Sequence, residues 1–84
     1  MINFKLTRHA EDALVKRKIK KEWLERVLAF PQRIETNTTD PALEHRLAEI
    51  SECENRVLRV IINPHTNPIR VVTLFFDRKI RGKL

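Results

Sequence analysis

The sequence predicts a small α+β domain, and three observations support this. The most apolar stretch, Arg56–Phe76, consists of two runs rich in Val, Ile, Leu and Phe, separated by Asn63-Pro64-His65-Thr66-Asn67-Pro68. Such runs favour strands and an Asn/Pro cluster favours a turn, so the stretch predicts a β-hairpin. Upstream of it, apolar residues recur at helical spacing in two segments. The length of 84 residues fits a single domain, 1–84, with one sheet and one helical layer.

One face of the predicted hairpin is wholly apolar and needs a cover. If Asn63 pairs with Ile69, that face carries Leu58, Val60, Ile62, Val72, Leu74 and Phe76. The other face then carries a polar pair, Arg59 and Thr73, among Val57, Ile61, Val71 and Phe75. A slip of one residue in either strand would exchange its two faces.

The residues before the hairpin predict a strand and two helices. Ile2–Leu6 alternates between apolar and polar residues, which is typical of a strand. Thr7 is placed to cap a helix that runs to about Arg17, and Lys18-Ile19-Lys20 is the expected joint. The second helix ends before Pro31, because proline pushes the preceding residue out of the α region. The two helices form an αα-hairpin whose apolar side covers the apolar face of the sheet.

The middle of the chain predicts two further strands. Gln32–Thr36 is the first of them. Leu43–Ile50 fits a helix by composition, or a strand by its alternation, and we prefer the strand because the polar turn Ser51–Asn55 has the length of a hairpin loop.

The pairing of this strand decides which side chains share the open face. If Ile50 pairs with Val57, then Arg46 joins Arg59 and Thr73 on the face away from the helices. In the same register His45 points inward.

The net charge of +6 is unevenly spread. Residues 1–30 carry +4, residues 31–55 carry −4 and residues 56–84 carry +6. The basic tail, Asp77–Leu84, fits a short helix, an extra strand or a disordered segment. Excess positive charge favours binding to phosphates or to an acidic protein, without choosing between them.

Composition also predicts the compartment. The single cysteine, Cys53, forms no internal disulfide and is typical of a reducing cytoplasm. There is no signal sequence and no apolar run near the ~20 residues that span a membrane, so we expect a cytoplasmic protein without membrane contact. The three histidines are scattered, so no metal site and no cofactor is expected.

The order β-α-α-β-β-β in a small basic chain resembles the RelE/ParE-like fold of bacterial toxins and messenger-RNA interferases. That fold has a curved antiparallel sheet with an αα-hairpin packed on one face. The chain is also similar to a widespread small family of unknown function, over roughly residues 3–76. The matching residues are Leu6-Thr7-Arg8-His9-Ala10, Arg17-Lys18-Ile19, Val27, Leu28, Pro31 and the strand Val71-Val72-Thr73.

The resemblance implies a toxin-like component of a toxin–antitoxin system, a metal-independent RNA endonuclease held in check by an acidic antitoxin. Cleavage by the RNA 2′-hydroxyl needs a base, an acid and cations near the phosphate. The chain contains no tyrosine, so a catalytic Tyr is not matched. The alternative is a non-catalytic protein- or nucleic-acid-binding module of the same fold. In the toxin interpretation the antitoxin would cover the apolar open face. Without an enzyme, a second copy of the chain in a homodimer would cover it.

Three residues are the catalytic candidates: His9 for proton transfer, and Arg46 and Arg59 for gripping the phosphate. Each has a structural alternative: a backbone contact for His9 and ion pairing for the arginines, with Glu44 as one partner. The candidates for binding nucleic acid are Lys16, Arg17, Lys20, Thr73 and Arg78. His45 and His65 are interpreted as structural and exposed residues, respectively.

Overall fold

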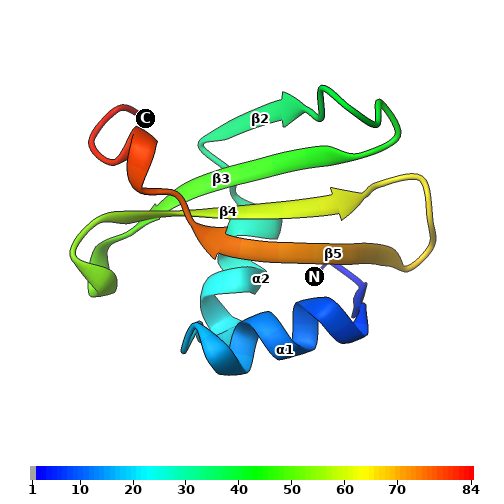
Figure 1. Cartoon of the computed structure of the whole chain (residues 1–84), viewed down its shortest axis with the longest axis horizontal. Coiled ribbons are helices and arrows are strands. Elements are labelled where there is room, and N and C mark those ends of the chain that lie inside the picture. Colours follow the sequence, from blue (N-terminus) through cyan, green and yellow to red (C-terminus); the bar gives the residue numbers. More distant parts are fainter. Residues whose placement is uncertain (1) are drawn as a thin grey trace.

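Two helices pack against one face of a five-stranded sheet, as Figure 1 shows. The computed structural model describes residues 2–84, and the α+β class predicted from the sequence is confirmed. The strands lie in the order β1-β5-β4-β3-β2. Along the chain the order is β-α-α-β-β-β-β, one strand more than the β-α-α-β-β-β that the resemblance implied. The elements are β1 (Phe4–Leu6), α1 (Arg8–Lys16), α2 (Lys21–Ala29), β2 (Arg33–Thr36), β3 (Glu44–Ile50), β4 (Arg56–Asn63) and β5 (Ile69–Phe76), with short 3₁₀ helices η1 (Ser51–Cys53) and η2 (Arg78–Ile80).

The sheet is mixed, which corrects the expectation of a wholly antiparallel sheet. β1 pairs with β5 in parallel, whereas the pairs β2–β3, β3–β4 and β4–β5 are antiparallel. The two helices carry the chain from β1 to the far edge of the sheet, and the later strands return by hairpins. The last strand therefore arrives beside β1 running in the same direction.

Thr7 fixes the start of α1, as predicted. Its hydroxyl oxygen accepts a hydrogen bond from the Ala10 N–H at 3.1 Å, and the same hydroxyl donates to the Val72 carbonyl at 2.9 Å. The cap therefore ties the helix to β5 as well as satisfying a free N–H. After α1, Lys18 adopts a positive φ of 53° and Ile19 turns inward, 5% exposed.

The main core lies between the helices and the sheet. α2 buries an apolar stripe that includes Leu24, Val27 and Leu28. β4 contributes Leu58, Val60 and Ile62, which confirms the face that the sequence assigned to the helices. Trp23 also packs here, with its ring edge-on to Phe76 at 6.1 Å between centroids.

The β4–β5 register differs from the prediction by a bulge. Asn63 pairs with Arg70, not with Ile69, and the register shifts again between Ile61 and Ile62. Beyond that shift the strands are two residues from the predicted pairing, so Arg59 pairs with Phe75 and not with Thr73. The shift preserves the predicted faces over most of the hairpin, but Val71 and Val72 each lie on the face predicted for the other. Val71 is fully buried on the helix side, and Val72 is only half-buried.

The β3–β4 register is also one residue from the prediction, and this exchanges the faces of β3. Ile50 pairs with Arg56 rather than with Val57, because η1 and two residues of positive φ, Glu54 and Asn55, form a five-residue connection. Arg46 consequently lies on the helix side, and His45 lies on the open face. Both predicted orientations were wrong for this single reason.

The C-terminal tail covers one end of the open face. The Asp77 N–H donates to the Val57 carbonyl at 2.8 Å, and an Arg33 guanidinium N–H donates to the Lys83 carbonyl at 3.2 Å. Leu47 and Val57 point away from the helices, yet both are fully buried. The expectation that Val57 lies partly exposed on the open face is therefore wrong, because the tail of the same chain packs over it.

Candidate nucleic-acid interface

The three catalytic candidates lie in different parts of the molecule. His9 is exposed on the first turn of α1. Arg46 lies between β3 and α2, and Arg59 lies on the open face of the sheet. Four cavities lie in the surface formed by residues 2–84, and none of these four is lined by any of the three candidates. The expected grouping of Arg46 with Arg59 is corrected by the β3 register described above.

Arg46 links the end of α2 to the sheet. One guanidinium N–H donates to the Leu28 carbonyl at 2.8 Å, and Nε donates to a Glu44 carboxylate oxygen at 2.8 Å. Carbonyls in the last turn of a helix have no partner inside the helix, so this contact satisfies one of them. The ion pair with Glu44 is the structural alternative that the sequence suggested.

Arg59 is the centre of a polar cluster on the open face, which we call the Arg59 cluster. Its Nε donates to Asp77 Oδ2 at 2.9 Å, and its Nη1 donates to Glu35 Oε1 at 3.0 Å. The same Nη1 lies 2.7 Å from His45 Nδ1, and His45 Nε2 lies 2.9 Å from Asn37 Nδ2. Only 12% of the Arg59 side chain is exposed.

The charges in the Arg59 cluster compensate one another. Hydrogen bonding from Arg59 holds the pKa of the Glu35 carboxyl below its ordinary value. Burial, and then the positive charge of Arg59, lower the pKa of His45, against a smaller opposing effect of Glu35. Because Arg59 already contacts two carboxylates, its charge is not free for a phosphate.

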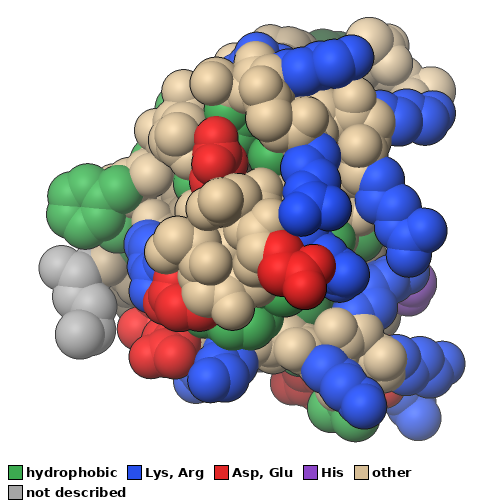
Figure 2. Space-filling model, turned by 90° about the vertical axis from the view of Figure 1, so that its left-hand side faces the viewer, with side chains coloured by type: hydrophobic (Ala, Val, Ile, Leu, Met, Phe, Trp, Pro, Cys, Tyr) green, Lys and Arg blue, Asp and Glu red, His purple; other side chains and the backbone are tan. Residues whose placement is uncertain are grey.

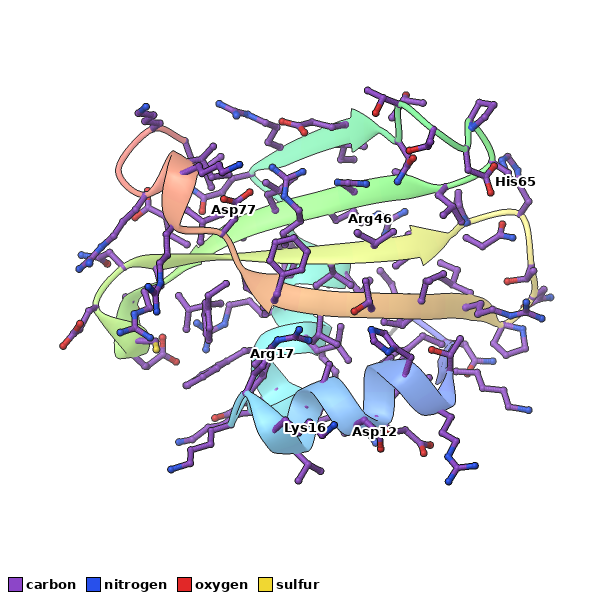
Figure 3. The ribbon with its side chains drawn as sticks, in the orientation of Figure 1. Asp12, Lys16, Arg17, Arg46, His65 and Asp77 are labelled. Atoms are coloured by element: carbon purple, nitrogen blue, oxygen red, sulfur yellow. The ribbon has the colours of Figure 1, made fainter. Side chains whose placement is uncertain are left out.

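A second group of arginines lies at the tail end of the sheet. Two adjoining cavities of about 340 and 260 Å³ share the side chains of Arg56, Phe76 and Arg78. We call them together the arginine groove, which is lined by Arg17, Arg56, Phe75, Phe76, Asp77, Arg78 and Arg81. In Figure 3, Arg17 and Asp77 lie in the same half of the molecule, and His65 lies at the opposite end.

Four chain segments form the groove. Arg17 follows α1, Arg56 begins β4, Phe76 ends β5, and Arg78 and Arg81 belong to the tail. The hairpin register brings them together, because Leu58 pairs with Phe76 and the strand ends beyond that pair lie side by side. Asp77 then starts η2 by accepting the Lys79 N–H at 3.0 Å.

The groove arginines have few acidic partners. Arg17 donates to the Leu74 carbonyl at 3.2 Å and Arg81 to the Glu54 carbonyl at 2.8 Å. Arg56 lies 3.9 Å from the Glu54 carboxylate, which is 74% exposed, and 6.0 Å from the Phe76 ring. Within residues 2–84, Arg78 makes no side-chain ion pair.

Figure 2 views this end of the molecule and shows Lys and Arg side chains gathered along its right-hand side. Acidic side chains lie mostly toward the centre and left of the view. Carbonyl contacts orient a guanidinium without neutralising it. The arrangement therefore leaves concentrated positive charge beside two phenyl rings, a combination suited to phosphates and to stacked bases.

The structure brings two of the five predicted nucleic-acid contacts into the groove, namely Arg17 and Arg78. Lys16 and Lys20 are exposed but line none of the cavities described above, and Lys20 lies over the Trp23 ring. Thr73 pairs with Ile61 on the open face, away from the groove.

Sequence reasoning missed Arg56, Arg81 and the phenyl rings. A signal for Arg56 was present, because any register near the observed one places the start of β4 beside the end of β5. No sequence pattern placed Arg81, since its position depends on the path of the tail.

The groove has few groups for proton transfer. Its only carboxylate, Asp77, is 13% exposed and accepts hydrogen bonds from Arg59 and from the Lys79 N–H.

Within residues 2–84 there is no group of three His, Cys, Asp or Glu placed to hold a metal ion. Both α-helices are nine residues long, and no helix in the described part of the chain is long and apolar enough to cross a membrane.

The comparison with protein families now places the chain. The family described as "Domain of unknown function (DUF4258)" matches residues 6–76. The chain belongs to this family. The predicted membership of a small family of unknown function is thereby confirmed. The match runs from the last residue of β1 to the last residue of β5, so Arg17 and Arg56 lie within it and Arg78 and Arg81 lie beyond it. No curated protein and no solved structure matches the chain.

Proposed function

We propose that this chain binds single-stranded RNA in the arginine groove. The observation that carries the proposal is the charge state of the groove. Two of its arginines are held by backbone carbonyls, whereas Arg46 and Arg59 are neutralised by carboxylates. Excess positive charge in a lined groove raises the local concentration of a polyanion and stabilises it once bound.

The groove chemistry favours a single strand over a duplex. A guanidinium can contact two oxygens of one phosphate, and several arginines in a row follow a backbone. Phe75 and Phe76 line the same groove, and unpaired bases stack on aromatic rings whatever their sequence. RNA is preferred to DNA because two helices followed by a run of antiparallel strands resemble the arrangement in RelE/ParE-like interferases.

A binding module fits the geometry better than a nuclease does. Cleavage needs a proton acceptor near the 2′-hydroxyl and a donor for the leaving oxygen. His9 lies outside the groove, and Asp77 is already bonded to Arg59.

A toxin-like endonuclease restrained by an acidic antitoxin is the second candidate. The array of guanidiniums favours it, because such groups stabilise the charge of a cleavage transition state.

The binding proposal is tested by fluorescence anisotropy with a labelled single-stranded RNA in a chelator-containing buffer. We expect the triple variant Arg56→Ala, Arg78→Ala, Arg81→Ala to weaken binding at least about 10-fold. Each lost phosphate contact also reduces the slope of log K against log salt by about 0.7. The matched control is Lys5→Ala, Arg8→Ala, Arg70→Ala, which removes the same charge from exposed positions outside the groove. Equal losses in both triples would show that only net charge matters and would reject the groove.

Cleavage is tested separately by inducing the chain in bacteria and following growth and total RNA integrity. The second candidate predicts arrest with RNA loss that the Arg56→Ala, Arg78→Ala, Arg81→Ala variant abolishes while it remains folded. RNA binding without arrest or cleavage supports the binding module. Absence of both binding and cleavage rejects both functions.

A further inference from the structure

β2 is an edge strand with one side unpaired. Its inner side pairs with β3, and no strand of residues 2–84 lies on its outer side. The Asn37 N–H bonds to the Leu43 carbonyl at 3.1 Å. Because the hydrogen-bonding direction alternates along a strand, Arg33 and Glu35 direct their backbone groups toward β3. The N–H and carbonyl of Ile34 therefore point outward.

This edge is only partly protected against pairing. Natural edges are protected by shortness, charged side chains, Pro or a bulge; β2 has four residues and carries Arg33 and Glu35, but it contains neither Pro nor a bulge. Ile34 is 55% exposed, and Phe30, just before the strand, is 78% exposed. They are two of the three exposed large hydrophobic residues in the described part of the chain, and the third, Val15, is on α1.

The side chains of β2 are complementary to themselves. Arg33 and Glu35 flank Ile34 and point to the open face, where they lie 3.5 Å apart and their side chains are 39% and 38% exposed. In an antiparallel pair centred on Ile34, the two isoleucines form the hydrogen-bonded pair with their outward backbone groups. Arg33 of each copy then lies opposite Glu35 of the other copy. Opposite charges across strands are favourable, and this register supplies two such pairs.

We propose that two copies of the chain pair edge to edge through β2, in an antiparallel register centred on Ile34. The pairing joins two five-stranded sheets into one sheet of ten strands, with both helical layers on the same side. A second copy is the occupant because its own Arg-Ile-Glu pattern places an opposite charge against each charge of β2. These cross-strand pairs add to the Arg33–Glu35 pair at 3.5 Å and the Arg59–Glu35 pair at 3.0 Å within one chain. A strand of four residues makes a small contact, so the dimer is weak and concentration-dependent.

The test is sedimentation equilibrium from about 5 to about 500 µM, a range that covers weak, transient interfaces. We expect the wild type to move from monomer to dimer across this range. Ile34→Lys should raise the dimer dissociation constant at least about 10-fold, because it places two ammonium groups against each other at the two-fold axis. Val15→Lys is the matched control at another exposed apolar position and should dimerise as the wild type does.

Charge exchange tests the register. Arg33→Glu alone places like charges opposite each other, and so does Glu35→Arg alone, so each variant should be monomeric. A mixture of the two variants should form a mixed dimer, since both carboxylates of the first variant then face guanidiniums of the second. Urea unfolding of each variant checks that it remains folded, because Glu35 also contacts Arg59. A wild type that stays monomeric, a dimer indifferent to Ile34→Lys, or variants that fail to associate when mixed would each overturn the proposal.

Discussion

Arg59 Nη1 lies 2.7 Å from His45 Nδ1, and this contact fixes the state of the imidazole. A guanidinium can only donate a hydrogen bond, so Nδ1 must accept it. The proton of the neutral ring is then on Nε2. On that side the ring faces Asn37 Nδ2 at 2.9 Å, while Asn37 Oδ1 accepts the N–H groups of Thr39 and Asp40. Two N–H groups therefore face each other, and the cluster lacks one acceptor.

Asn37→Asp should stabilise the protein because it supplies that acceptor. The retained oxygen still accepts the two backbone N–H groups, and the new oxygen accepts from His45 Nε2. We expect about 1–2 kcal/mol of added stability from a charge-assisted hydrogen bond, together with a raised pKa of His45. Urea unfolding and an NMR titration of the imidazole measure the two effects. Asn37→Ser shortens the side chain, so a gain in that control as well would contradict the explanation.

Mild acid should destabilise the wild type through His45. Its pKa is lowered in the folded protein, mainly by burial, so the unfolded chain binds the proton more readily. The contribution to stability is complete above the ordinary pKa of 6.5 and is lost as the pH falls below that value. Comparing urea midpoints at pH 7.5 and 5.5 tests this. His45→Gln should reduce the difference between the two midpoints, and an unchanged difference would assign the effect to other groups.

Arg59→Ala should be among the most destabilising substitutions of a charged residue. It leaves the carboxylates of Glu35 and Asp77 and the His45 nitrogen without their donor, and Asp77 is 13% exposed. We expect a loss of about 3 kcal/mol in the free energy of unfolding. Arg26→Ala is the control, since its pair with Glu52 is 40% and 44% exposed and should contribute little. Similar losses for both would mean that burial does not distinguish them.

The same cluster shows where prediction from the sequence stopped. The helices, the hairpin and the strand Glu44–Ile50 followed from apolar spacing, a cap at Thr7 and the break at Pro31. Those signals are local and need no partner. Register depends on how many residues a turn contains, and the positive φ of Glu54 and Asn55 shortened that turn by one residue. The slip placed His45 beside Arg59 and removed Arg46 from the proposed site.

Only part of the arginine groove was predicted, because the positions of its other arginines depend on the strand register and on the path of the tail. Arg17 was chosen with Lys16 and Lys20 as a basic group around the helix joint, and Arg78 as part of the basic tail; Arg17 and Arg78 both line the groove. Arg56 required the hairpin register, and Arg81 required the fold of the tail. The tail also covers Leu47 and Val57, so an apolar face that suggested a partner is closed at one end by the chain itself.

Thr7→Ala should cost about 1–2 kcal/mol, more than loss of a helix cap with no second contact. The hydroxyl bonds both the Ala10 N–H and the Val72 carbonyl, so its removal affects α1 and β5 together. Thr7→Ser retains both hydrogen bonds and should restore most of the loss. Thermal or urea unfolding of the three proteins measures this, and a serine variant as unstable as the alanine variant would assign the effect to the lost methyl group.

Arg46→Ala should separate structural arginines from those that bind ligand. The substitution leaves the Leu28 carbonyl and the Glu44 carboxylate without a donor. Only 17% of the Arg46 side chain is exposed. We expect about 2–3 kcal/mol of lost stability, because both acceptors remain partly buried. At a temperature where the variant is still folded, its affinity for single-stranded RNA should match that of the wild type.

Arg78→Ala should do the reverse, since Arg78 is exposed and makes no ion pair within residues 2–84. Its unfolding curve should be unchanged while RNA affinity falls. If Arg46→Ala instead weakened RNA binding as much as Arg78→Ala did, in a fully folded sample, the binding surface would have to extend beyond the arginine groove to the side of the sheet that carries the helices.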